Sequence, residues 1–137
     1  MAISLTLALQ PDSLALCRLP PSTPIPDWVP ASGFLSLTRT KDELSVVCLA
    51  AQVPAAVQQD SGWRAFKVEG PLDLAMTGVL TALSQPMVDA GISLFVISTF
   101  DTDYVLVRTQ DIDRASKAWE QAGHRVNILL SPPKRKR

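Results

Sequence analysis

Two carboxylates and three hydroxyl groups lie between two apolar runs, in the stretch from Ser98 to Asp103. Asp101 and Asp103 have the D-x-D spacing with which carboxylates hold a hard divalent cation in enzymes that transfer nucleotide sugars. This chain of 137 residues lacks the length and the Rossmann-like frame of that enzyme class. The alternative is loop chemistry, because aspartate side chains bond nearby backbone N–H groups and stabilise turns. A tight hairpin would carry Asn-Gly or Asp-Gly here, and the stretch has no glycine.

Other patterns that carry chemistry are sparse. His124 is the single histidine, and it follows Gly123 at an expected helix end, where an imidazole meets free carbonyl groups or faces solvent. The chain has no GxSxG elbow for a nucleophilic serine, and no GxxxxGK[ST] or GxGxxG loop for phosphates. Together with His124, Cys17 and Cys48 are too few and too scattered for a zinc site. We therefore expect no catalytic residue, no metal and no cofactor.

The charge distribution argues against a nucleic-acid partner. The formal net charge is +0, but residues 134–137 are all basic, which leaves nine basic against 13 acidic residues in the body, a net charge of −4. A nucleic-acid-binding body needs a basic face. The basic segment reads either as a solvated terminus or as a segment for nuclear import or an anionic partner.

The composition is typical of a globular protein that buries a core, with 47% hydrophobic and 19% charged residues. Cys17 and Cys48 both lie in apolar, strand-like contexts, so we expect buried free thiols. The first ten residues lack the basic region of a signal peptide, and no apolar run reaches the length of a membrane span. These features predict a cytoplasmic protein without a membrane partner.

The second half of the chain predicts an alternation of strands and helices. Residues 63–70 read as a strand, and apolar residues then recur at three- and four-residue steps, as in a helix buried on one face: Leu72, Met76, Val79, Leu80, Leu83 and Met87. Asp73 suits the first turn of this helix, Pro86 should kink it and Gly91 should cap it.

Two apolar strands follow at 92–98 and 104–108, then a second helix from Asp111 to Gly123 and a last strand at 124–130. This β-α-β-β-α-β order predicts an α+β, ferredoxin-like arrangement. Its helices cover one face of the sheet, so the other face needs a partner, in the first half or in a second subunit. RNA-recognition domains share the topology, but the strands here lack their base-stacking aromatic motif.

The first half reads as two hairpins and two connections. Residues 3–16 alternate around a turn at 10–13, and residues 34–47 form a second hairpin. Prolines between them predict an ordered loop anchored by Trp28. Residues 51–62 read as a joint between the halves.

The second half resembles a known family. The segments "FKVEGPLDLAMTGVLTALSQPMVDA" and "GISLFVISTFDTDYVLVRTQDIDRA" are similar to ACT domains, and most similar to bacterial ACT-domain proteins related to the cytosolic arginine sensors of the TOR pathway. Upstream, "FLSLTRTKDELSVVC" resembles the strand-turn-strand that precedes the ACT repeat in those sensors. The resemblance implies tandem ACT-like halves: a degenerate one at 1–60, an ACT domain at 61–130 and a basic tail at 131–137.

The resemblance also implies non-catalytic binding of an amino acid. Thr99 and Asp103 stand where the sensors use a threonine and an aspartate near the ligand, so Asp103 would pair with the α-ammonium group. Backbone N–H groups of residues 70–73 would meet the α-carboxylate, since a helix N-terminus suits an anion. The remaining candidate ligand-binding residues are Ser98, Phe100, Leu72 and Asp73.

One departure from the sensors bears on the ligand. They carry acidic residues in the first helical turn that help to hold a guanidinium group, whereas residues 74–76 here are Leu, Ala and Met. Burying an unpaired guanidinium is costly, which favours a smaller or less charged amino acid. We expect a homodimeric sensor that passes its state to an unidentified protein partner. The alternative is a structural or interaction module that binds no ligand.

Overall fold

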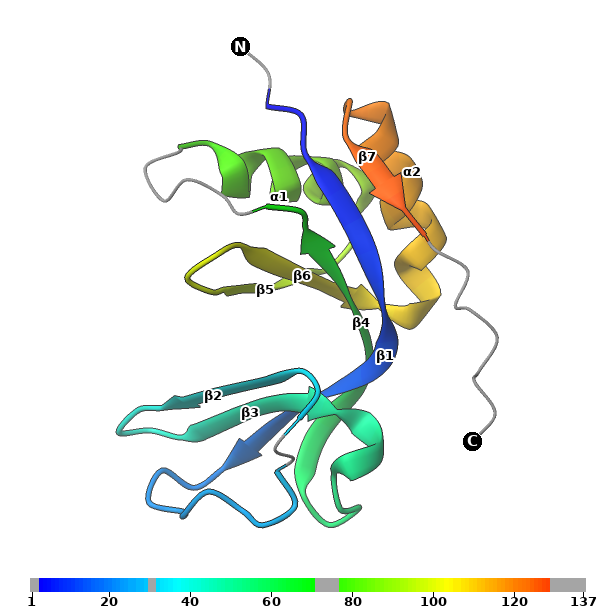
Figure 1. Cartoon of the computed structure of the whole chain (residues 1–137). Helices are drawn as coiled ribbons and strands as arrows, with labels where there is room; N and C mark the ends of the chain where they lie inside the picture. The colour runs from blue at the N-terminus through cyan, green and yellow to red at the C-terminus, as the bar shows by residue number, and fades with distance from the viewer. Residues whose placement is uncertain (1–2, 30–31, 71–76, 129–137) are drawn as a thin grey trace. The chain divides into compact units, whose positions relative to one another are not determined.

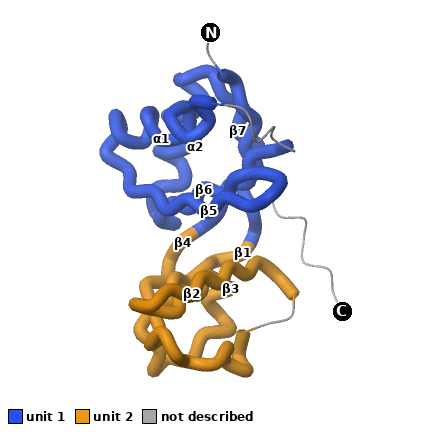
Figure 2. Tube along the Cα trace, turned by 90° about the vertical axis from the view of Figure 1, so that its left-hand side faces the viewer, with its two compact units in different colours: residues 1–11, 64–137 blue, residues 12–63 orange. Residues whose placement is uncertain are grey.

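The computed structural model describes residues 3–29, 32–70 and 77–128, and it divides into two compact units (Figure 2). Unit 1 comprises residues 1–11 and 64–137, and unit 2 comprises residues 12–63. The elements are β1 (Thr6–Leu19), β2 (Leu35–Arg39), β3 (Leu44–Leu49), a short 3-10 helix (Ala50–Gln52), β4 (Gln58–Val68), α1 (Val79–Ala90), β5 (Phe95–Ser98), β6 (Asp103–Arg108), a second 3-10 helix (Thr109–Asp111), α2 (Ile112–Gln121) and β7 (Arg125–Asn127).

Unit 1 has the predicted α+β, ferredoxin-like fold, with elements in the chain order β4-α1-β5-β6-α2-β7 (Figure 1). Its strands lie in the order β7-β1-β4-β6-β5. The start of β1 is an additional strand between β4 and β7, and its residues Thr6 to Ala8 pair in parallel with Arg125 to Asn127. The N-terminal residues of the chain therefore complete the sheet of the second half.

The two helices of unit 1 share one core with one face of its sheet. This core consists of strand residues Leu7, Phe66, Val68, Val105 and Val107, and of helix and loop residues Leu5, Val79, Leu83, Met87, Ile92, Ala115 and Trp119. The rings of Phe66 and Trp119 meet edge to face, with centroids 4.9 Å apart. Aromatic pairs favour this geometry, because the positive edge of one ring faces the negative face of the other.

The helix α1 ends at Gly91, as the sequence predicts, but its predicted start is wrong. It begins after Gly78 and not near residue 72, and no acidic residue lies in its first turn, so Asp73 does not have the predicted place there. Gly91 has φ 71° and donates its N–H to the last carbonyls of α1, a left-handed conformation that glycine adopts without steric cost. Leu80 was expected on the buried face, but its side chain is 53% exposed. Positions 79, 83 and 87 already fill the buried stripe, and Leu80 lies about 100° further round the helix. Leu72 and Met76 lie outside the described residues.

Unit 2 is an antiparallel sheet with the strand order β2-β3-β1-β4. The predicted hairpin of β2 and β3 is present, and Leu44, Val46 and Cys48 of β3 face a small core. Trp28 packs against this core, as expected of the proline-rich loop. Cys17 and Cys48 are buried free thiols. Burial raises the pKa of the Cys17 thiol from 9.0 to about 11, with a smaller contribution from Cys48.

Two predictions for the first half are wrong. Residues 3–16 do not form a hairpin, because Thr6–Leu19 is one continuous strand. Pro11 lies between the two stretches of β1 that pair with β7 and β3, residues 6–8 and 14–19. Its missing N–H therefore removes no bond from these two ladders. Residues 58–62 are not part of a joint, because β4 already begins at Gln58.

The division into two ACT-like halves stays a prediction, and the basic tail lies outside the described residues. No helix in the described part of the chain is long and apolar enough to cross a membrane.

Candidate functional site

The stretch between β5 and β6 is a tight turn that closes without glycine. The backbone N–H of Thr99 donates to the carbonyl of Thr102 at 2.8 Å. The Thr99 hydroxyl donates to that same carbonyl at 3.0 Å and accepts the N–H of Thr102 at 3.2 Å. No described residue other than glycine has a positive φ. The side chain of Thr99 thus supplies the turn closure that Asn-Gly would otherwise provide.

Ser98 and Asp103 form a pair at the base of this turn. They are partners in the β5–β6 register, and the Ser98 hydroxyl donates to Asp103 Oδ1 at 2.6 Å. Only 9% of Asp103 is exposed. Because side chains alternate along a strand, Asp103 shares the helix-covered face of the sheet with Val105 and Val107 of the core. A carboxylate therefore lies at the margin of an apolar core.

The negative charge of the Asp103 carboxylate has no cationic partner among the described residues. Among the described residues, the structure gives Asp103 one hydrogen bond, from the neutral Ser98 hydroxyl, and no lysine, arginine or histidine partner. Burying a carboxylate without a cation is costly. The hydroxyl protons of Ser98 and Thr99 are both donated within the turn. Their oxygens can therefore accept hydrogen bonds from a ligand but cannot donate to it. The turn is suited to a group that donates several hydrogen bonds and carries positive charge.

Thr102 is the residue of this site that the sequence analysis missed. It is 95% buried, and its hydroxyl donates to the carbonyl oxygen of Val68 at 2.6 Å. Val68 is the last residue of β4, two positions before the segment 70–73 that is expected to bind the ligand carboxylate. This bond brings the turn and the end of β4 together, although the two residues are 34 positions apart. No local pattern in the sequence indicates such a pairing.

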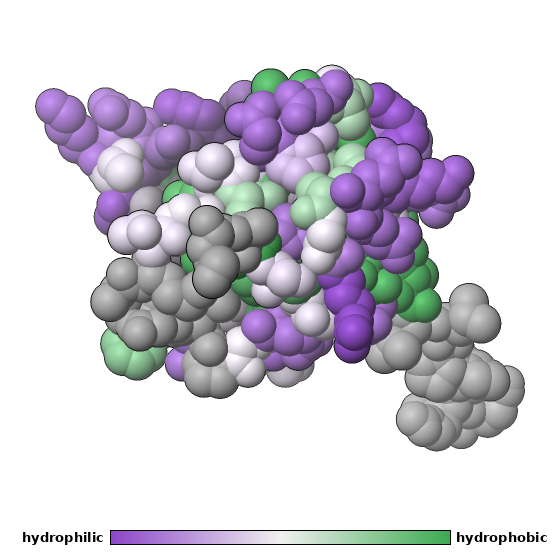
Figure 3. All heavy atoms as spheres, turned by 90° about the horizontal axis from the view of Figure 1, so that it is seen from above, coloured by the Kyte–Doolittle hydropathy of each residue, from purple (hydrophilic) through white to green (hydrophobic). Residues whose placement is uncertain are grey.

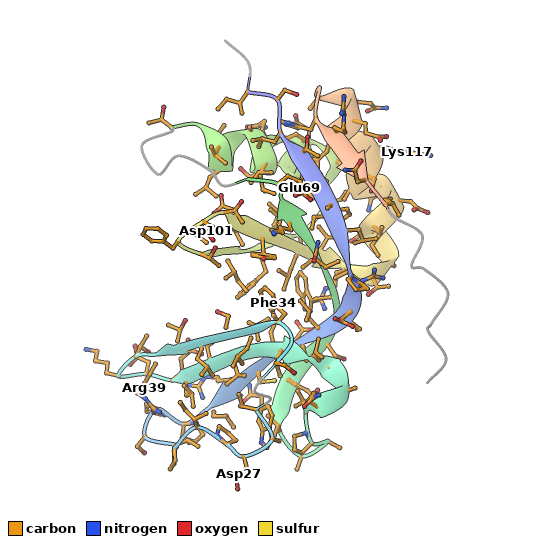
Figure 4. The ribbon with its side chains drawn as sticks, viewed as in Figure 1. Asp27, Phe34, Arg39, Glu69, Asp101 and Lys117 are labelled. Carbon is orange, nitrogen blue, oxygen red and sulfur yellow. The ribbon has the colours of Figure 1, made fainter. Side chains whose placement is uncertain are left out.

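The other predicted residues are not gathered in the same way. Phe100 is 83% exposed. Asp101 lies at the turn between β5 and β6 (Figure 4). Glu69, which follows the last residue of β4, is labelled in the same view. Leu72 and Asp73 lie outside the described residues. The structure thus pairs Ser98 with Asp103 and uses Thr99 to close the turn, and it leaves Phe100 in solvent.

A groove of about 980 Å³ lies elsewhere in unit 1, between α1, α2 and the first residues of the chain. Small residues form much of its lining, among them Gly78, Ala82 and Ala118, and none of the residues 98–103 contributes to it. In the view from above, strongly hydrophilic side chains surround a central area of intermediate hydropathy, drawn white to pale green (Figure 3).

His124 lines this groove and is 6% exposed. Of the two sequence expectations, the contact with a free carbonyl is correct, because Nε2 lies 3.1 Å from the oxygen of Ala82. Within the described residues, no group of three or more His, Cys, Asp or Glu side chains is arranged to hold a metal ion.

Comparison with known proteins agrees with this fold. A family model described as "ACT domain" matches residues 58–121, and a second family model, which describes an N-terminal domain, matches residues 12–56. The human "Putative protein CASTOR3P" is 33% identical over 84 residues, which cover 61% of this chain and 48% of the human protein. The chain therefore spans about half the length of this curated relative.

Solved structures extend the similarity over nearly the whole chain. The protein Atu0741 from Agrobacterium tumefaciens is 39% identical, with a TM-score of 0.89 over 94% of this chain and 96% of its own. The regulatory subunit of aspartate kinase from Thermus thermophilus is 14% identical, with a TM-score of 0.59 over 85% of this chain and 96% of its own. At that identity the likeness shows the fold alone. Residues 58–121 therefore belong to the ACT-domain family.

Proposed function

We propose that this protein is a non-catalytic, cytoplasmic sensor that binds an amino acid reversibly through Asp103. The observation that carries the proposal is the buried Asp103 carboxylate, which has one neutral hydrogen-bond donor and no cationic partner among the described residues. An α-ammonium group supplies the missing charge and three N–H donors, and the oxygens of Ser98 and Asp103 are acceptors that it can reach. Membership of a regulatory domain family supports the same role.

The expected carboxylate partners are the N–H groups of residues 70–73, which stay a prediction because 71–76 lie outside the described residues. Leu72 and Asp73 keep their proposed place beside the ligand on the resemblance alone. Thr99 contributes through the turn that it closes, and Phe100 would contact the ligand only by moving from its exposed position.

Thermal denaturation in the presence of each of the twenty common amino acids tests this proposal. We expect one or a few of them to raise the melting temperature of the parent chain, and Asp103→Asn to abolish that rise. Asp101→Asn is the matched control, because it removes a carboxylate from the same turn at an exposed position. An equal response of parent and Asp103→Asn would exclude Asp103 from the site.

The alternative function is a ligand-free interaction module, and exposed apolar side chains favour it. Phe100 is 83% exposed, Val88 69% and Leu80 53%, and exposed apolar groups of this size are common at protein interfaces. A flat response to all amino acids, together with capture of a specific protein partner that Phe100→Ser abolishes, would establish this function instead.

We also propose that the protein is a homodimer. Among the described strands, β5 lies at the edge of its sheet with β6 as its single neighbour, and such an edge can pair with the same strand of a second copy. Analytical ultracentrifugation tests this directly, and a monomer at micromolar concentration would contradict it.

A further inference from the structure

We propose that Thr102 is a positioning residue of the amino-acid site, and that its buried hydroxyl holds the Ser98–Asp103 pair against the end of β4. The inference rests on the function proposed above, because Thr102 acts on the ligand only through Asp103. It adds a residue that the resemblance does not assign to the site.

The hydroxyl group of Thr102 is bonded to a rigid part of unit 1. Thr102 is 5% exposed, and its Oγ1 donates to the carbonyl of Val68 over 2.6 Å, a short bond for a neutral hydroxyl. Val68 is the last residue of β4, and its side chain is fully buried in the core of unit 1. The acceptor is therefore fixed by the core, and Thr102 is attached to a rigid point.

The backbone of Thr102 also closes the turn with Thr99. Its carbonyl accepts both the N–H and the hydroxyl of Thr99, and its N–H donates to the same hydroxyl. Asp103 follows it directly in the chain, and Ser98 directly precedes Thr99. A movement of Thr102 therefore displaces both members of the pair that offers the carboxylate.

The turn is weakly supported on the side of β5. β5 is the edge strand of the unit 1 order β7-β1-β4-β6-β5, so its single neighbour is β6. It is short, with four residues, and only Phe95 to Ser98 pair with β6. β6 is anchored by its pairing with β4, whereas β5 and the turn are attached to the sheet through β6 alone. Without the bond from Thr102 to Val68, the turn loses its direct attachment to β4, and edge strands fray first.

Thr102→Val tests the inference, because valine keeps the shape of threonine and lacks the donor. In the ligand-free protein, we expect the Thr99 amide to exchange its hydrogen about tenfold faster in this variant, since the turn loses its attachment. Thr102→Ser retains a hydroxyl and should restore the parent rate. The amide of Ala122, which bonds to Ala118 at the end of α2, is the internal reference and should not change. If Thr102→Val does not fold, Thr102→Ala is the second variant without a hydroxyl.

The binding measurement uses the amino acid that raises the melting temperature of the parent most. We expect Thr102→Val to weaken its binding about tenfold, and Thr102→Ser to bind within about threefold of the parent. Ile92→Val is the matched control for stability, because it truncates the same core without touching the turn. It should lower the melting temperature and leave the affinity unchanged.

The two measurements separate the possible failures. Unchanged exchange at Thr99 in Thr102→Val overturns the positioning role, whether or not a ligand is found. Unchanged affinity in Thr102→Val, in a parent that responds to an amino acid, overturns it as well. A parent that responds to no amino acid overturns the proposed function, and the role of Thr102 in an amino-acid site falls with it. Faster exchange at Thr99 in Thr102→Val would then show that Thr102 holds the turn without serving a ligand.

Discussion

The Nε2 atom of His124 lies 3.1 Å from the carbonyl oxygen of Ala82, four residues before Pro86. A regular helix would bond this carbonyl to the N–H of residue 86, which proline lacks. The Leu5 N–H donates to His124 Nδ1 at 3.0 Å, so the neutral ring carries its proton on Nε2 and donates it to Ala82. The next carbonyl, of Leu83, accepts the indole N–H of Trp119 at 2.9 Å. The imidazole of His124 thus takes the place of the N–H that Pro86 lacks, and the indole of Trp119 bonds to the neighbouring carbonyl of α1.

His124→Ala should destabilise the protein by about 3 kcal/mol, because it leaves the buried N–H of Leu5 and the partly buried carbonyl of Ala82 without their partner. Urea denaturation measures the change. Lys117→Ala, on the exposed side of α2 (Figure 4), is the control and should change the free energy of unfolding by less than about 0.5 kcal/mol. A cost as small as that of the control would show that the imidazole is dispensable.

The pairing of His124 with the proline of α1 is testable by a double-mutant cycle. Pro86→Ala restores an N–H that can bond the carbonyl of Ala82. His124→Ala should therefore cost about 1 kcal/mol less in the Pro86→Ala background than in the parent. Additive costs in the same urea experiments would contradict a shared carbonyl.

Asp103 should be a residue that binds ligand at the expense of stability. Asparagine keeps an oxygen to accept the Ser98 proton and carries no charge. We expect Asp103→Asn to leave the ligand-free protein as stable as the parent or more stable, by about 0 to 1 kcal/mol, because a buried unpaired charge is removed. Denaturant unfolding of the ligand-free chains checks this. A loss above about 2 kcal/mol would mean that the carboxylate serves the fold.

The buried thiols predict how stability changes in alkaline solution. Since burial raises the pKa of Cys17 from 9.0 to about 11, the folded state holds its proton more tightly than the unfolded chain does. The thiol's contribution to stability is therefore complete below about pH 9 and is lost as the pH rises towards 11. The stability difference between the parent and Cys17→Ala should shrink over that interval in urea titrations. A difference independent of pH would refute this.

Reactivity of the thiols gives a second, simpler measurement. Cys17 and Cys48 are both buried, and burial raises both pKa values. A thiol reagent at pH 8 should label neither in the folded protein and both after denaturation, because the thiolate is the reactive form. Rapid labelling of the folded chain would contradict the burial.

Much of unit 1 was predictable from local patterns. Apolar spacing placed the buried stripe of Val79, Leu83 and Met87, and Gly91 marked the helix end, because these signals depend on neighbouring residues only. The turn from Ser98 to Asp103 was likewise recognised as polar between buried strands. The resemblance to ACT domains added the reason to single out Asp103.

The sequence by itself determined the order of strands and helices after residue 63 and the chemical identity of the candidate turn. The tertiary structure decided the rest. Thr6–Leu19 is one strand that runs through both units, His124 bonds to the carbonyl of Ala82, and Thr102 bonds to the carbonyl of Val68. These last two contacts join residues 42 and 34 positions apart. The physical reason is that a hydrogen bond of that range leaves no periodic or local signature in the chain, since its partner is chosen only when the packed elements bring two unsatisfied groups together.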